Sequence, residues 1–258
     1  GVIGEAMGGL RHLTAEPGRV PVRVGVSIGD TLAALHGAIG VLLALYHRKA
    51  HGGKGQVIDV ALHEAVFNCM ESLIPEYSAF GAVREAAGSA LPGIAPSNAY
   101  PCKDGWVLVA GNGDSIFKRL MTAIGRQDLA DAPDLASNAG RVARVAEIDT
   151  AIGKWTFQSS VQEVMDALGA ARVPAGKVYT AKDICEDPHY QAREMLLTQE
   201  TRDGYSVTVP GVVPKMSGTP GGVRRSAPGL GDDTDAVLAE AGLTNEQITL
   251  LRSKGVIQ

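Results

Sequence analysis

Cysteine is scarce in this sequence of 258 residues. Only Cys69, Cys102 and Cys185 are present, and no two of them form a Cys-x-x-Cys pair. This number excludes a disulfide framework and a cysteine-rich zinc site. No charged leader followed by an apolar run opens the sequence. Together, these features predict a protein of the reducing cytoplasm.

An excess of basic residues is also lacking. Lys and Arg total 24 against 28 Asp and Glu, which gives a net charge of −4. Proteins that bind nucleic acid or anionic membranes usually carry a basic excess, so we expect neither partner. Because 45% of the residues are hydrophobic, the chain can fill a packed core as one large domain or two modest ones.

No apolar run reaches the length that a membrane span requires. The longest, residues 31–46, is shorter than the roughly 18 to 20 apolar residues of a spanning helix. Its apolar residues recur at helical spacing, and small residues such as Gly37 and Gly40 follow another face. This pattern predicts a buried helix that a neighbouring element approaches closely, ending at Gly52 and Gly53.

Around this helix the pattern predicts an α/β fold with a second, smaller α+β unit. Two helices begin with the spacing of a capping box, at Ser160 and Glu163 and at Thr244 and Gln247. In the first half of the chain we expect loop and short extended pieces over 1–29, a strand at 56–61, a helix over 62–82 that is broken or kinked at Pro75, and a hairpin of strands near 100 and 106–110 turning at Asp104-Gly105. In the second half we expect helices near 114–124, 145–157 and 160–170, a strand at 173–179, mostly helix over 181–197, a strand at 206–210, and helices at 232–241 and 245–254.

Changes in composition divide the chain into four parts. We expect a part of a large domain over 1–82 and a linker over 83–98. A small α+β domain follows over 99–195, and a return segment with the C-terminal helices over 196–258.

Motifs for nucleotide or metal chemistry fail on spacing. Gly111-Asn112-Gly113 lacks the third glycine of a dinucleotide fingerprint, and Gly52-Gly53-Lys54-Gly55 lacks the Walker spacing. His36 is better explained as a satisfied core histidine, and His47 and His51 have no evident third ligand. We therefore expect no metal and no tightly bound cofactor.

Asp30 is the strongest candidate for a catalytic carboxylate. It lies between an extended segment and the apolar helix, where Asp commonly serves as the N-cap. A carboxylate at a helix start is also kept ionised by the helix dipole and can attack an acyl carbon. The N-cap and the nucleophile are compatible interpretations, because capping and catalysis do not exclude each other.

A series of short motifs adds a second line of argument. They are RVGVSIGD (23–30), GAIGVLLALYHR (37–48), GKGQVIDVAL (53–62), PSNAYP (96–101), DGWV (104–107), VPAGKV (173–178), DPHYQAR (187–193), SGTP (217–220) and APGLG (227–231). In this order, over essentially the whole chain, they resemble the class III CoA-transferase family, the formyl-CoA transferase-like CaiB/BaiF group.

This resemblance implies a Rossmann-like large domain, a small α+β domain, and a C-terminal segment that returns to the large domain. It also implies an interlocked homodimer that moves CoA from an acyl-CoA donor to a small carboxylic acid. By the same resemblance, Asp30 attacks the thioester and forms first a mixed anhydride and then an aspartyl-CoA thioester.

The resemblance also points to residues that bind substrate. Gly29 precedes the catalytic aspartate, and Gly93 and Pro96 lie in the region that matches a glycine-rich loop of the family. We expect these three residues to line the acyl pocket. Only Gly88 and Gly93 remain of the tetraglycine pattern, which argues against specificity for formyl-CoA or oxalate.

Family members typically begin with a further third of chain that holds most CoA contacts, and these 258 residues do not match it. We therefore expect weak or no activity from them alone.

Two alternatives stay open. In a related α-methylacyl-CoA racemase, an aspartate at the position of Asp30 works with an upstream histidine to exchange an α-proton. Its usual glycine run is replaced here by residues 31–35. The second alternative is a non-catalytic binding or assembly module that keeps the fold.

Overall fold

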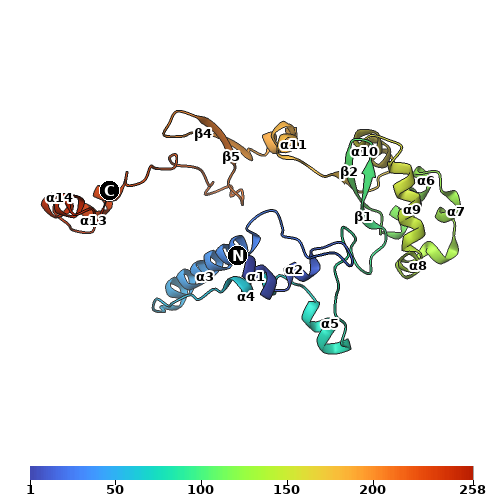
Figure 1. Ribbon diagram of the computed structural model, residues 1–258, viewed down its shortest axis with the longest axis horizontal. Coiled ribbons are helices and arrows are strands. Elements are labelled where there is room, and N and C mark those ends of the chain that lie inside the picture. Colours follow the sequence, from blue (N-terminus) through green and yellow to red (C-terminus); the bar gives the residue numbers. More distant parts are fainter. Residues whose placement is uncertain (258) are drawn as a thin grey trace. The chain divides into compact units, whose positions relative to one another are not determined.

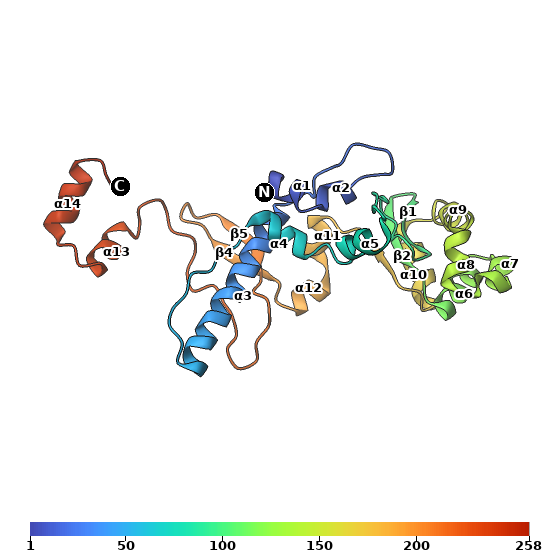
Figure 2. The same cartoon turned by 90° about the horizontal axis from the view of Figure 1, so that it is seen from below.

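The computed structural model describes residues 1–257 and consists of two compact units. The first unit runs from Gly1 to Val178, and the second begins at Tyr179. Helices and strands are mixed, as the sequence predicts for an α/β protein (Figures 1 and 2).

The first unit begins with helices. They are α1 (Val2–Met7), α2 (Leu10–Leu13), α3 (Ile28–His51), α4 (Leu62–Asn68) and α5 (Leu73–Phe80). The expectation of loop throughout residues 1–29 is wrong, because α1 and α2 form there. The long apolar helix is confirmed as α3. It ends where the sequence predicts, since Gly52 adopts a left-handed φ of 64°.

Helix α1 packs closely on α4 through glycine. A Cβ atom added at Gly8 would lie 2.5 Å from Val66 Cγ1 and 2.9 Å from the carbonyl oxygen of His63, and one at Gly4 would lie 3.0 Å from Leu62 Cβ. Gly4 and Gly8 are four residues apart and therefore share one helix face. The missing side chains let the two helices approach each other (Figure 1).

The prediction that α3 is buried is wrong for this chain. Only Gly29 is buried along the whole helix. The apolar side chains of its C-terminal half are largely exposed, among them Leu35, Ile39, Leu42, Leu43 and Tyr46. The physical reason is a lack of neighbours, since α1 and α4 pack near the start of α3 and its C-terminal half extends beyond them (Figure 2).

Helix α3 is longer than the apolar run of residues 31–46 that was compared with a membrane span. It has 24 residues, and among the described residues it is the one helix long and apolar enough to cross a membrane by length and composition. The expectation that no apolar segment is long enough for a membrane span is therefore wrong. A core helix of a soluble protein passes the same test.

No strand forms at 56–61 in the described chain, which contradicts the prediction. Residues 52–61 are irregular, and Val57 is 94% exposed. An extended segment becomes a strand only with a hydrogen-bonding partner, and none is present here. The close approach expected at the small residues of α3 does occur, because a Cβ atom at Gly40 would lie 2.9 Å from Ile58 Cγ2.

The helix expected over 62–82 is broken, though not at Pro75. The break covers residues 69–72, where Glu71 has a positive φ of 50°, and separates α4 from α5. Pro75 is the third residue of α5. Proline is tolerated in the first turn because its missing N–H would have no partner within the helix.

A three-stranded antiparallel sheet forms the centre of the C-terminal part of the first unit, residues 97–178. β1 (Ser97–Cys102) pairs with β2 (Gly105–Ala110), with Cys102 opposite Gly105, which confirms the predicted hairpin. β3 (Ala175–Lys177) pairs with the other edge of β2 and confirms a strand in 173–179. Asp104 Oδ1 accepts a hydrogen bond of 2.8 Å from the backbone N–H of Val161 and so attaches the hairpin to the following helices.

Helices cover this sheet and enclose the hydrophobic core. The predicted ones are α6 (Asp114–Ala123), α9 (Val145–Thr156) and α10 (Val161–Ala170), and the capping box of Ser160 and Glu163 is present. The sequence did not indicate α7 (Gln127–Ala130), the 3-10 helix η1 (Pro133–Ala136) or α8 (Asn138–Ala143). The core between sheet and helices includes Val107, Val109, Leu120, Ile148, Ile152 and Leu168.

The second unit contains short elements. They are α11 (Ala181–Glu186), α12 (Pro188–Ala192), β4 (Leu196–Glu200), β5 (Ser206–Pro210), α13 (Thr234–Glu240) and α14 (Asn245–Ser253). The strand at 206–210 and both C-terminal helices are confirmed, as is the capping box of Thr244 and Gln247. β4 pairs with β5, so the expectation of helix up to residue 197 is wrong at its end.

The contact between α1 and α4 gives a prediction about stability. Gly8→Ala places a methyl group against Val66, and we expect overpacking to cost about 1–3 kcal/mol of the free energy of unfolding. Gly37→Ala is the matched control, because an added Cβ there meets nothing within 4 Å. The control should be neutral or stabilising by about 1 kcal/mol. Urea unfolding measures both, and equal stabilities of the two variants would contradict the close packing.

Candidate active site

Asp30 is exposed in the first turn of α3. No hydrogen bond or ion pair among residues 1–257 includes its carboxylate. A Cβ atom added at Gly1 would lie 2.5 Å from Asp30 Oδ2, so the backbone at the start of α1 adjoins this oxygen. The carboxylate therefore has free lone pairs and lies at the helix end where the dipole favours a negative charge.

The interpretation of Asp30 as the N-cap is wrong. Ser27 is the N-cap residue and Asp30 is the third residue of the helix. Ser27 Oγ does not cap the helix but accepts a hydrogen bond of 3.3 Å from Arg23 Nη2. The Ser27 carbonyl oxygen accepts from both the N–H and the hydroxyl of Thr31, each at 3.1 Å. Asp30 thus makes no capping hydrogen bond, and its carboxylate oxygens keep their lone pairs for a substrate.

The buried carboxylate of Glu5, on α1, lies beside this first turn of α3. The Glu5 side chain is 0% exposed, and its Oε2 accepts a hydrogen bond of 3.3 Å from Arg11 Nε. Glu5 Oε1 has no hydrogen-bond donor, and Arg23 Nε lies 3.9 Å from it. Arg23 thus lies between the buried charge of α1 and the N-cap residue Ser27. The burial of Glu5 is not predictable from the sequence, since nothing in the local pattern distinguishes it from an exposed helical Glu.

Gly29 lies on the inner side of the same turn. It is buried, and a Cβ atom there would lie 3.4 Å from Val66 Cγ2 and 3.7 Å from Glu5 Cγ. These are ordinary van der Waals distances, so protein atoms already occupy the space beside the Cα atom. Gly29 therefore connects Asp30 to the support formed by α1 and α4.

Gly93 and Pro96 belong to a separate, well-anchored loop between α5 and β1. Gly93 has a φ of +74°, and an added Cβ there would meet nothing within 4 Å. Its carbonyl oxygen accepts a hydrogen bond of 2.8 Å from Asn138 Nδ2, and the Pro96 carbonyl accepts one of 2.9 Å from the N–H of Gly111. Neither residue hydrogen-bonds to Asp30 or Gly29 among the described residues. The first unit thus holds the expected site residues as two clusters.

Polar side chains fix the end of this loop where β1 begins. Tyr100 Oη donates to Asp149 Oδ1 at 2.6 Å, and Asn98 Nδ2 donates to Asp149 Oδ2 at 3.0 Å. Burial and the hydrogen bond to Asp149 raise the pKa of Tyr100 above its usual value. Ser89 Oγ donates to Asn98 Oδ1 at 2.5 Å and continues the network into the loop.

The start of the loop touches the segment after α2. The N–H of Gly88 donates to the carbonyl oxygen of Ala15 at 2.9 Å, and a Cβ atom at Gly88 would lie 2.6 Å from Glu16 Oε2. A hollow of about 600 Å³ lies beside this contact, lined by residues such as Arg19 and Ser89.

The remaining candidate groups have little catalytic character. Burial raises the pKa of the Cys102 thiol, and Asp104 adds to the effect. Cys69 is exposed. His36 is satisfied as expected, with Nδ1 2.8 Å from the Leu32 carbonyl oxygen and Nε2 3.3 Å from Asn68 Oδ1. It is half-buried, so the expectation of a core histidine is wrong. Among residues 1–257, no group of three or more His, Cys, Asp or Glu side chains could hold a metal ion.

Comparison with known proteins gives this geometry a context. The sequence model of CoA-transferase family III matches residues 1–234. The chain belongs to this family. It is 42% identical, over its whole length, to succinyl-CoA–D-citramalate CoA-transferase of Chloroflexus aurantiacus, of which it covers 64%. It is 33% identical, over 99% of its length, to formyl-CoA:oxalate CoA-transferase of Streptomyces avermitilis, of which it covers 66%.

Solved structures agree with this family assignment. The crystal structure of a CAIB/BAIF family protein from Brucella suis matches 93% of the chain with a TM-score of 0.79 and 30% identity, and the match covers 62% of that protein. A protein of Mycobacterium tuberculosis shares the fold at 19% identity and a TM-score of 0.76 over 90% of the chain. The chain thus spans somewhat less than two thirds of the first relatives that it matches.

The buried Glu5 gives a prediction about the support of the site. Arg11→Met removes the hydrogen bond to Glu5 and leaves a buried carboxylate with Arg23 as its remaining ion-pair partner. Breaking a buried ion pair costs about 3–5 kcal/mol, and Arg11 is partly exposed, so we expect the free energy of unfolding, measured with urea, to fall by roughly 2 kcal/mol.

Arg19→Met, at an exposed site, is the control and should change stability by less than about 0.5 kcal/mol. The double variant Glu5→Met with Arg11→Met buries no charge and should be more stable than Arg11→Met alone. A double variant that is no more stable would contradict the role of the buried charge.

Proposed function

We propose that the protein containing this chain transfers CoA from an acyl-CoA donor to a free carboxylic acid, with Asp30 as the nucleophile. The observation that carries this proposal is the unpaired, exposed carboxylate of Asp30 in the first turn of α3. Membership in CoA-transferase family III and relatives named as CoA-transferases support it.

The proposed reaction divides one difficult exchange into acyl transfers through a single enzyme carboxylate. Asp30 attacks the thioester carbonyl, and the CoA thiolate leaves as a mixed anhydride forms. The thiolate then attacks the aspartyl carbonyl, which releases the first carboxylate and leaves an aspartyl-CoA thioester. The acceptor carboxylate attacks this thioester to form the second anhydride and free the thiolate. Attack by the thiolate on the acceptor's acyl carbonyl regenerates Asp30 and yields the new acyl-CoA.

For the substrates, we propose succinyl-CoA as donor and a small dicarboxylic acid as acceptor. Relatives at 36–42% identity are named for succinyl-CoA with D-citramalate or L-malate. The loop at 88–98 holds two glycines rather than a tetraglycine run, which favours this pair over formyl-CoA and oxalate. CoA acts as a substrate in this scheme, so no resident cofactor is required. We also propose a cytoplasmic location, which the three free cysteines support.

Replacing the proposed nucleophile tests the reaction. In the full-length protein, Asp30→Ala should lower kcat by a factor on the order of 10³ or more. The wild type mixed with acyl-CoA should form an adduct on Asp30 that hydroxylamine cleaves, and intact-protein mass spectrometry detects it. Because Asp30 makes no cap, the variant should lose only about 0.3–1 kcal/mol of stability.

Asp30→Asn is the isosteric control and should likewise form no adduct. Transfer by Asp30→Ala at the wild-type rate would end the catalytic claim. Wash-in of solvent deuterium at the α-carbon without an adduct would indicate a racemase instead.

We also propose an interlocked homodimer. The exposed apolar residues of α3, among them Leu42 at 66% and Tyr46 at 68%, form a surface that a stable protein covers. Two chains threaded through each other cannot separate without unfolding.

Mixing tagged and untagged full-length protein tests this arrangement. We expect twice the chain mass by light scattering and no mixed dimers after incubation, because exchange requires unfolding. Mixed dimers should form only when the two proteins are unfolded and refolded together. A monomer, or rapid exchange under native conditions, would contradict the proposal.

A further inference from the structure

Two side chains of α8 hold the loop between α5 and β1 in place by hydrogen bonds to its backbone. Asn138 is the first residue of α8. Its Oδ1 accepts a hydrogen bond of 3.1 Å from the N–H of Ala95, and its Nδ2 donates to the carbonyl oxygen of Gly93 at 2.8 Å. One amide group thus pairs with the backbone on both sides of Ile94, much as a neighbouring strand would.

Arg141 holds the same loop from one turn further along α8. Its side chain is 0% exposed, and Nε donates to the carbonyl oxygen of Ala95 at 3.0 Å. Nη1 donates to the Leu135 carbonyl at 3.0 Å, and Nη2 donates to the Asn112 carbonyl at 2.7 Å and to Asp114 Oδ1 at 2.8 Å. A buried charge is tolerated only when it is paired, so movement of the loop would leave part of this guanidinium without an acceptor.

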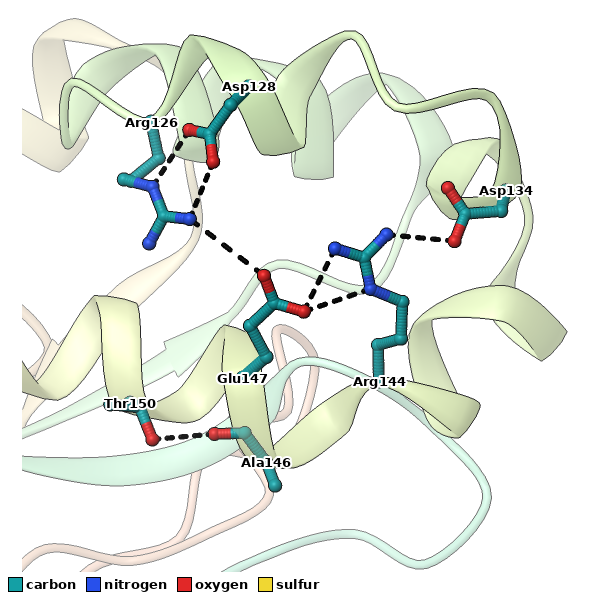
Figure 3. A network of polar contacts seen from close by, with 7 residues as sticks. All are labelled: Arg126, Asp128, Asp134, Arg144, Ala146, Glu147 and Thr150. Atoms are coloured by element: carbon teal, nitrogen blue, oxygen red, sulfur yellow. Dashed lines mark hydrogen bonds and ion pairs between the residues drawn. The ribbon is translucent and has the colours of Figure 1, made fainter.

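Helix α8 is itself braced by an ion-pair network (Figure 3). Arg144, directly after the helix, donates to Asp134 Oδ2 at 2.8 Å and to Glu147 Oε2 at 2.9 Å. Glu147 Oε1 lies 3.9 Å from Arg126 Nη2, which in turn pairs with Asp128 at 2.6 Å. These arginines lower the pKa of Asp134 and of Asp128, so both carboxylates stay ionised at neutral pH. The network joins α8 to η1, α7 and α9.

The remainder of the loop is fixed as well, and its tip is open. The N–H of Ile94 donates to the Leu91 carbonyl at 3.2 Å, and the N–H of Leu91 donates to the Ser97 carbonyl at 3.1 Å. Pro92 and Gly93 are exposed. The backbone of this loop is therefore ordered by contacts within the protein, while its tip stays accessible.

We propose that Asn138 and Arg141 are positioning residues. They hold the buried backbone at Ala95 and Pro96, so that the exposed tip of the loop at Gly93 is a preformed wall of the acyl pocket. This inference rests on the proposed function and on the expectation from the family resemblance that Gly93 lies at the acyl pocket. A wall that is fixed in advance loses no conformational entropy when the acyl group binds. The hydrogen bonds from Asn138 and Arg141 therefore favour each acyl-transfer step.

Asn138→Ala in the full-length protein tests the proposal. Asn138 is partly exposed, so the variant should fold while losing both hydrogen bonds to the loop. Two such bonds correspond to roughly a tenfold effect or more, so kcat/KM for donor and acceptor should fall about tenfold. The Kd of free CoA should stay within about twofold, because CoA has no acyl group to meet the wall. Amide hydrogen exchange over residues 88–98 should accelerate about tenfold.

Asn245→Ala is the matched control, since Asn245 is exposed and is also the first residue of a helix, α14. It should change neither the kinetics nor the exchange over 88–98. Unchanged exchange in Asn138→Ala would overturn the positioning role. Faster exchange with unchanged kcat/KM would overturn the pocket wall, while the Asp30 adduct of the wild type would leave the proposed function intact. A wild type without adduct or transfer would remove the proposed function and the pocket wall together.

Discussion

A buried guanidinium must be surrounded by acceptors, and Arg141 imposes this requirement on the first unit. Its acceptors come from four places in the chain: the loop before β1, η1, the turn after β2, and the first residue of α6. The Phe117 ring lies 5.2 Å from the guanidinium carbon. Because an unpaired buried charge costs several kcal/mol, these segments are confined to one arrangement. The loop that carries Gly93 and Pro96 is part of it.

The start of α3 combines a rigid support with a free reactive group. Glycines of α1 let α4 approach, and buried Glu5 lies beneath Gly29. Asp30 projects from this support with its carboxylate unpaired. A nucleophile needs both properties, since its position must be fixed while its lone pairs remain available. The two clusters of the candidate site are therefore built alike. Buried Glu5 lies beside the backbone that carries Asp30, and buried Arg141 fixes the loop that carries Gly93.

Local signals proved reliable where the relevant interaction spans only a few residues. The capping boxes at Ser160 and Thr244 were predictable because the cap and its partner are three residues apart, and the hairpin at Asp104 because its strands adjoin in the chain. The strand at 56–61 and the burial of α3 were not, because both require partners distant in sequence. An extended or apolar pattern indicates that a segment would pair as a strand or be buried if a partner were present. It does not show whether another segment of the chain provides that partner.

The sequence by itself determined α3 and its end at Gly52, the helices α6, α9 and α10, and the hairpin of β1 and β2. It also determined the family resemblance and the choice of Asp30, since all of these depend on short-range patterns. Only the tertiary structure decided that Asp30 is exposed and free of capping, that Glu5 and Arg141 are buried, and that Asn138 pairs with the loop at Gly93. These facts depend on contacts between segments far apart in the chain. Burial and long-range pairing are properties of the packed molecule, and no local pattern of residue types encodes them.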